Sequence, residues 1–143
     1  MRNPGASQNP RGRGRRRTRG GLSIGHVLLS HGINVRQFGR NPETLKIVKI
    51  RGAIIGKKPS KTKFEFVIDA TGSGEGLGVA IGMCRPHGTV VMKSTVYNKV
   101  AIDMASVIVP ENTLVGSRCG RFAPALKLSK DEKIDVQTLI QGD

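Results

Sequence analysis

The sequence predicts one α/β domain in which parallel strands alternate with helices. Near-continuous apolar runs at residues 64–70 and 89–92 are typical of parallel strands that are covered on both faces. A glycine-rich turn and an apolar helical stripe lie between these two runs, which favours a strand–helix–strand unit. The chain has 143 residues, a length that fits a single domain with its own core.

The charge of the chain is concentrated at its beginning. The formal net charge is +14, and nine Arg but no Asp or Glu precede Glu43. Residues 1–20 contain no large apolar side chain after Met1, so we expect an Arg/Gly-rich disordered segment there. The apolar periodicity begins after this segment, and residues 21–143 form the predicted domain.

The first half of the domain reads as helix, strand, helix, strand. A helix begins near Leu22 and ends at the His31-Gly32 pair, because its apolar residues recur at helical spacing and glycine follows. Residues 33–38 can form a short strand. Asn41, followed by proline and glutamate, predicts the capped start of a helix that buries an apolar face and ends before Gly52. Residues 53–55 form a minimal strand.

In the second half, the strongest strand is predicted at residues 64–70. The helix that follows has an apolar stripe made by Leu77, Ala80, Ile81 and Cys84. Further strands are expected at residues 89–92 and 113–117, with a strand-like segment at 107–109 between them. Helices are expected at residues 123–128 and 136–140.

Three strings carry a family resemblance: VIDATGS (67–73), RPHGTVVMKST (85–95) and NTLVGSRCGRFAPAL (112–126). From about Gly21 to its end, the chain resembles the nucleotide-binding domain of zinc-type medium-chain alcohol dehydrogenases, in particular the alcohol and threonine dehydrogenase-like branch. The resemblance implies a Rossmann-like sheet with strand order 3-2-1-4-5-6 and an NAD(P)-dependent oxidoreductase lineage.

The phosphate-binding turn of this family is degraded here. Alignment places its third glycine at Gly21, so Arg16 and Thr18 stand where the first two glycines belong. RGRGRRR replaces the apolar strand, and burying unpaired arginines costs several kcal/mol each. We therefore expect that residues 11–17 form no normal central strand, and that the sheet is split or another segment fills the gap. Uniform high amide-exchange protection across residues 13–17 would contradict this expectation.

The resemblance also implies where a cofactor would lie. Gly39 stands where an acid normally binds the ribose of NAD, and Arg40 follows it, which suits the 2′-phosphate of NADP. The alternative is a turn glycine and a solvated arginine. The other positions that border the cofactor in the family correspond to Gly21, Ala70, Thr71, Gly72, Ser94, Thr95, Ser117 and Arg118. Ordinary structural roles are the alternative at this edge: Asp69 is then a polar residue at the end of a strand, and Cys119, which follows Ser117 and Arg118, is a small buried residue.

No catalytic residue or zinc site is expected in this chain. His26, His31 and His87 do not combine with a cysteine at zinc-ligand spacing, and we expect surface or capping roles for all three. Two cysteines make no disulfide framework and suit a reducing cytoplasm. No apolar run approaches the roughly 20 residues of a membrane span.

Three hypotheses follow. The first is a truncated NAD(P)-binding domain that is not catalytic alone, whose N-terminus arises from a frameshift or misplaced start; translating the upstream DNA in all frames tests this. The second is a nucleic-acid-binding protein that uses its basic arm, which requires strong salt dependence. The third is a partner, or homo-oligomer, that completes its sheet with another chain.

Overall fold

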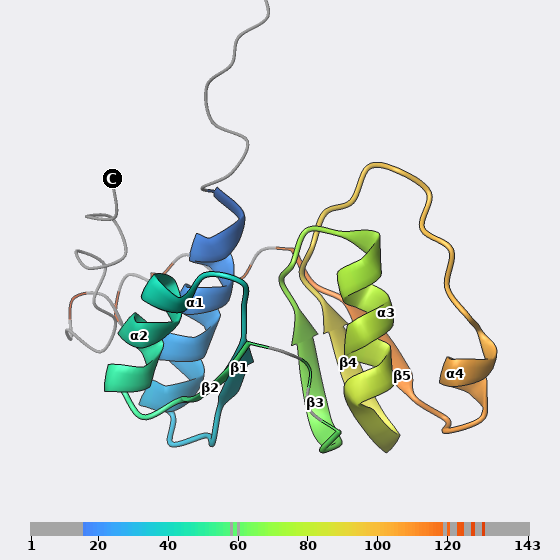
Figure 1. Ribbon diagram of the computed structural model, residues 1–143, viewed down its shortest axis with the longest axis horizontal. Coiled ribbons are helices and arrows are strands. Elements are labelled where there is room, and N and C mark those ends of the chain that lie inside the picture. Colours follow the sequence, from blue (N-terminus) through green and yellow to red (C-terminus); the bar gives the residue numbers. More distant parts are fainter. Residues whose placement is uncertain are drawn as a thin grey trace, which may run out of the picture.

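The computed structural model describes residues 16–57, 59, 61–118 and 120, together with 123, 124, 127 and 130. The predicted α/β class with parallel strands is confirmed (Figure 1). The elements, in chain order, are α1 (Arg16–Ser30), β1 (Arg36–Phe38), α2 (Pro42–Ile50), β2 (Ile54–Gly56), β3 (Phe64–Asp69), α3 (Gly74–Met83), β4 (Cys84–Met92), α4 (Ala105–Ile108) and β5 (Thr113–Gly116).

The first unit contains α1, α2 and a two-stranded parallel sheet formed by β1 and β2. Asn41 caps α2 as predicted, since its side chain accepts a hydrogen bond of 3.0 Å from the Glu43 amide. Gly52 has a φ of +100° at the end of this helix. Leu22 from α1 and Val48 from α2 are buried together in the core of the unit.

Helix α1 begins at Arg16, so five residues of the segment expected to be disordered are helical. Arginine is a good helix former and no proline interrupts residues 16–30, which explains the earlier start. The proposed domain boundary at residue 21 stays a prediction.

The prediction for His26 is wrong. This residue was expected at the surface, but it is only 1% exposed. It follows the buried Leu22 by four residues, so both side chains lie on the same face of α1. His31 does occupy the predicted position at the helix end, where its Nδ1 lies 2.8 Å from the Val27 carbonyl oxygen. His87 is exposed, with its Nδ1 3.3 Å from a carboxylate oxygen of Glu111.

The second unit is a three-stranded parallel sheet of order β3-β4-β5, with α3 packed against it. Its core contains Val67, Ala80, Ile81, Cys84, Val90 and Val107. The expectation that β3 is covered on both faces is wrong within the described residues, because Phe66 is 66% exposed. Val67 and Phe66 are neighbours along the strand, so their side chains point to opposite faces and only one face is packed.

Residues 107–109 were expected to be strand-like, but α4 ends at Ile108. The Asp103 carboxylate accepts a hydrogen bond of 3.1 Å from the Ala105 amide, which satisfies a donor at the start of this short helix. Val107 is then buried while Ile108 and Val109 are exposed. The expected helical segments at 123–128 and 136–140, and Cys119, lie largely or wholly outside the described residues.

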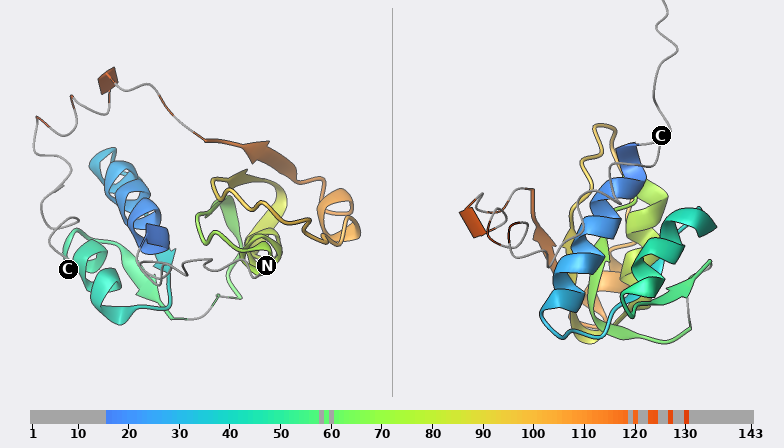
Figure 2. Two further views of the ribbon diagram at one scale, coloured as in Figure 1. Left: turned by 90° about the horizontal axis from the view of Figure 1, so that it is seen from above. Right: turned by 90° about the vertical axis from the view of Figure 1, so that its left-hand side faces the viewer.

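Within the described residues the sheet is split between β1 and β3, which is one of the two expected alternatives. Figure 2 shows from above that the two units lie side by side. The Phe38 and Phe64 rings meet edge to face across the division, with centroids 6.3 Å apart, and the Arg36 guanidinium lies 5.7 Å from the Phe64 centroid. Arg16 and Arg17 are in α1, and residues 11–15 lie outside the described part of the chain.

None of the described helices is long and apolar enough to cross a membrane.

The buried thiol of Cys84 provides a test of this core. Burial raises its pKa, and the charges of Lys63 and Arg85 oppose that shift to a smaller extent. An unfolded cysteine ionises at about pH 8.5, so above this pH the unfolded state loses its proton before the folded state does. We expect stability to fall more steeply with pH above about 8.5 in the native chain than in Cys84→Ala. Urea unfolding at pH 7.5 to 10 measures both slopes, and equal slopes would contradict the assignment.

Candidate functional site

The candidate site is the edge of the sheet where β3 and β4 end. Asp69, the last residue of β3, is only 3% exposed, and its carboxylate organises the following turn. One oxygen of Asp69 accepts hydrogen bonds from the Thr71 amide at 3.0 Å and from the Thr71 hydroxyl at 2.7 Å. These two bonds hold the chain in the bend that leads from β3 toward α3.

Ser94 joins this turn to the neighbouring strand. Its hydroxyl accepts a hydrogen bond of 2.8 Å from the Gly72 amide and lies 3.3 Å from the Asp69 carbonyl oxygen, to which it donates. Gly72 has a φ of +71°, a left-handed conformation that glycine adopts without steric cost. The ends of β3 and β4 are therefore held together by one hydrogen-bonded cluster of Asp69, Thr71, Gly72 and Ser94, which we call the strand-end cluster.

Helix α3 begins directly at the strand-end cluster. Ser73 is its N-cap, and the Ser73 hydroxyl accepts a hydrogen bond of 3.1 Å from the Gly76 amide. A methyl group at Gly76 would overlap the Thr71 hydroxyl, so this position requires glycine. The glycine-rich turn thus brings the first turn of the helix close to the end of β3.

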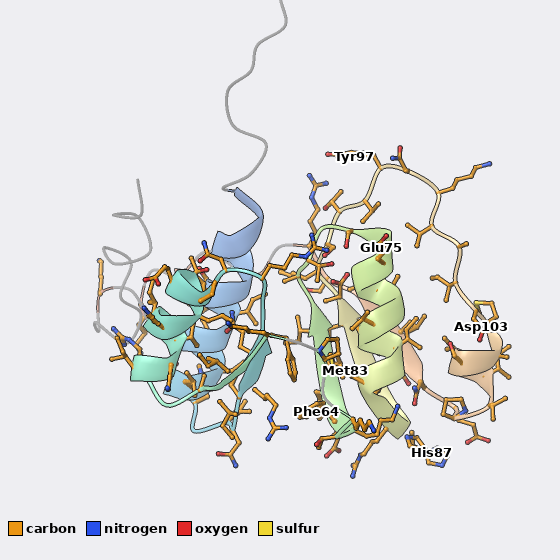
Figure 3. The ribbon with its side chains drawn as sticks, in the orientation of Figure 1. Phe64, Glu75, Met83, His87, Tyr97 and Asp103 are labelled. Carbon is orange, nitrogen blue, oxygen red and sulfur yellow. The ribbon has the colours of Figure 1, made fainter. Side chains whose placement is uncertain are left out.

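A cavity of about 640 Å³ lies beyond the start of α3. The turn residues Gly72 to Glu75, with Gly78 of α3, line one side of it, and the loop at residues 95–101 lines the other. Figure 3 shows Glu75 and Tyr97 at this end of the molecule, and Tyr97 is 94% exposed. Glu75 and Lys99 give the lining charges of both signs.

The structure gathers most of the predicted cofactor-bordering residues on this edge. Ala70, Thr71, Gly72 and Ser94 lie at the strand-end cluster, and Thr95 lines the cavity. A Cβ atom at Gly21 of α1 would lie 3.8 Å from the Ala70 Cβ. The Ser117 amide donates to the Met92 carbonyl at 3.0 Å, and the Lys93 ammonium donates to the Arg118 carbonyl at 2.5 Å, so both residues lie beside the end of β4.

Gly39 and Arg40 directly follow β1 and are not members of this cluster. A Cβ atom at Gly39 would come 3.3 Å from Leu45 of α2, which is tighter than ordinary contact. Packing against α2 therefore accounts for a small residue here without reference to a cofactor. Arg40 is exposed.

Two residues that shape this part of the structure were not identified from the sequence. Asp69 appeared as an ordinary strand end, although it anchors the turn through two bonds to Thr71. Gly25 is buried where the Gln37 side chain of β1 occupies the space of its missing Cβ. Gly21 and Gly25 are four residues apart, a spacing that puts both on one face of a helix and could have indicated close packing there.

A dinucleotide fits this site only in part. The strand-end cluster and the cavity provide polar groups at the carboxyl ends of parallel strands, where α/β folds bind ligands. The pyrophosphate turn does not fit, because the positions of its first two glycines, Arg16 and Thr18, are inside α1. Among the described residues, no three His, Cys, Asp or Glu side chains are grouped so that they could hold a metal ion.

No protein-family model matches the sequence, and no curated protein matches it. Solved structures do match the fold. The chain is similar to 2R,3R-butanediol dehydrogenase from Bacillus subtilis, with a TM-score of 0.71 and 21% identity over 81% of this chain. It is also similar to acetophenone reductase from Geotrichum candidum in complex with NAD, with a TM-score of 0.72 and 17% identity over 80% of this chain.

A third similar structure, from Sinorhizobium meliloti, is described as a zinc-binding dehydrogenase bound to NADP; its TM-score is 0.68 and its identity 18% over 82% of this chain. The chain spans 38%, 36% and 42% of the lengths of these three proteins, in the order given. At these identities the likeness shows a shared Rossmann-like fold.

Two glycines of α3 provide a matched test of the site. We expect Gly76→Ala to destabilise the chain by about 1–3 kcal/mol, because the new methyl group must displace Thr71 from its bonds to Asp69. Gly78→Ala meets no atom within 4 Å and should stabilise the same helix by up to about 1 kcal/mol. Urea unfolding measures both, and equal effects of the two substitutions would contradict the close packing of Gly76 on Thr71.

Proposed function

We propose that this chain binds a nicotinamide dinucleotide, as the nucleotide-binding part of an alcohol dehydrogenase-like oxidoreductase. The observation that carries the proposal is the strand-end cluster, which presents Thr71, Gly72 and Ser94 at the carboxyl ends of two parallel strands. Ligands of open α/β sheets bind outside these strand ends, near the point where the strand order reverses. That point lies between β1 and β3 in this fold.

The proposal assigns binding, and no catalytic step, to the residues of this chain. A bound nicotinamide supplies hydride transfer, and the protein's part is to hold and orient it. Ala70, Thr71, Gly72, Ser94 and Thr95 would border the cofactor on one side of the division, and Ser117 and Arg118 beside β5. Gly21 would lie under it, where α1 approaches both β1 and the end of β3.

We propose further that NADP is preferred to NAD. Leu45 leaves little room beside Gly39, so no carboxylate is available there to accept a hydrogen bond from a ribose hydroxyl. Arg40 is exposed at the next position, and a guanidinium binds a phosphate through paired, charge-assisted hydrogen bonds.

Because α1 does not provide the glycine turn that holds a pyrophosphate, we expect weak binding, with a Kd nearer 1 mM than 1 μM. Titration of the purified chain with NADPH and with NADH, followed by calorimetry, measures the affinity and the preference. Absence of saturable binding for both would refute the proposed function. Equal or tighter binding of NADH would refute only the NADP preference.

The matched variants are Arg40→Gln and Arg85→Gln, which remove the same charge. Arg40→Gln should weaken NADPH binding about tenfold, or about 1.4 kcal/mol, and leave NADH binding unchanged, because a charge-assisted hydrogen bond is lost. Arg85 pairs with Glu65 at 3.0 Å at the amino-terminal end of the sheet, so Arg85→Gln should change neither affinity. An equal loss in both variants would assign the effect to net charge.

A further inference from the structure

The split of the sheet leaves two strand edges beside each other. The edge of β1 opposite β2, and the edge of β3 opposite β4, form no ladder with any strand in the described part of the chain. Figure 1 shows β1 between β2 and β3, so these two edges border the division. An unpaired strand edge is a template for pairing with another chain.

The hydrogen bonds to the neighbouring strands identify which backbone groups point into the division. The Ile54 amide donates to the Val35 carbonyl and the Gly39 amide to the Gly56 carbonyl, so Val35 and Gly39 are directed toward β2. Because the direction of the backbone N–H and C=O groups alternates along a parallel strand, those of Phe38 point away from β2. In the same way, the Lys93 amide donates to the Asp69 carbonyl, so the backbone groups of Asp69 point toward β4. Those of Phe66 and Ile68 then point away from β4.

In the part of the chain that the structure describes, side chains connect the two edges, and no backbone ladder does. Phe38 and Arg36 of β1 contact the Phe64 ring at the beginning of β3. At the other end, a Cβ atom at Gly21 of α1 would be 3.7 Å from Gln37 and 3.8 Å from Ala70, so α1 touches both sides of the division. The two edges thus have a fixed helix over them and a pair of aromatic rings at one end.

We infer that these edges bind an extended segment of another protein, which enters as a strand parallel to β1 and β3 and joins the two sheets into one. Its chemistry follows from the surroundings. An incoming strand needs apolar residues on the face that α1 covers, and a small residue is required where α1 approaches closely at Gly21. Arg36 and Lys63 lie at the amino-terminal ends of β1 and β3, so acidic residues should flank the amino-terminal end of the incoming strand.

The net charge of the chain favours an acidic partner over two other occupants, which are a second copy of the chain and the chain's own RGRGRRR segment. A second copy would bring another formal charge of +14, so like-charge repulsion disfavours it. The chain's own RGRGRRR would place several unpaired arginines in the middle of a sheet. An acidic partner is attracted by the same charge. The inference is independent of the proposed cofactor, since it concerns the strand edges and no residue of the strand-end cluster.

The experiment uses the full chain and a fluorescent synthetic peptide, Glu-Glu-Val-Val-Ala-Val-Gly-Ala. We expect saturable binding by anisotropy, together with amide exchange slowed at least tenfold at Phe38, Phe66 and Ile68. Exchange at Val90, which lies within the β3-β4-β5 ladder, should not change. The same peptide N-methylated at alternate residues, and a version with Lys-Lys in place of Glu-Glu, should each bind at least tenfold more weakly.

Two charge reversals test the direction of entry. Arg36→Glu should reduce the preference for the Glu-Glu peptide over the Lys-Lys peptide at least tenfold. Lys49→Glu, an equal change of charge on the exposed surface of α2, should leave this preference unchanged. Absence of binding, or equal binding of the N-methylated peptide, overturns the inference. It is also overturned if Phe66 and Ile68 are already protected in the chain alone and lose that protection when residues 1–15 are deleted, because the chain's own segment is then the occupant.

Discussion

No backbone ladder joins β1 to β3 within the described residues, and the arrangement of the molecule depends on this division. Hydrogen bonds between strands normally make a parallel sheet one rigid layer. Here the contact of Phe38 and Arg36 with Phe64, and the approach of α1 to Ala70, take that role. The contact between the rings and the cation–π contact each contribute on the order of 1 kcal/mol, so among the described residues these contacts couple the two units more weakly than a backbone ladder couples the strands within each unit.

Each unit has its own core, which is why the division does not prevent either from packing. Leu22, Val48 and Ala53 are buried between α1, α2 and β2, and a separate cluster around Val67 and Val90 is buried beneath α3. The strand-end cluster belongs to the second unit alone, because Asp69, Thr71, Gly72 and Ser94 bond to one another across β3 and β4. The proposed cofactor edge therefore does not require an intact first half of the sheet, whereas the phosphate-binding turn does.

The proposed function and the inferred partner concern different parts of the same division. The cofactor edge consists of side chains and turns at the carboxyl ends of the strands, while the partner site consists of the backbone groups of Phe38, Phe66 and Ile68. An added strand would bring the two units into one sheet and hold Gly21 and Ala70 in place. Strand pairing would in this way stabilise the cofactor edge without contacting the cofactor.

Local signals in the sequence determined most of the elements and indicated that residues 11–17 form no normal central strand. The Asn41-Pro42 cap, the apolar spacing of α3 and the runs of β3 and β4 act within a few residues, and the burial cost of RGRGRRR follows from charge alone. Tertiary structure decided the rest. The burial of His26, the exposure of Phe66 and the helical start at Arg16 depend on which faces other elements cover. The bond of Ser94 to Gly72 joins residues 22 positions apart, and no local pattern specifies such a distant pair.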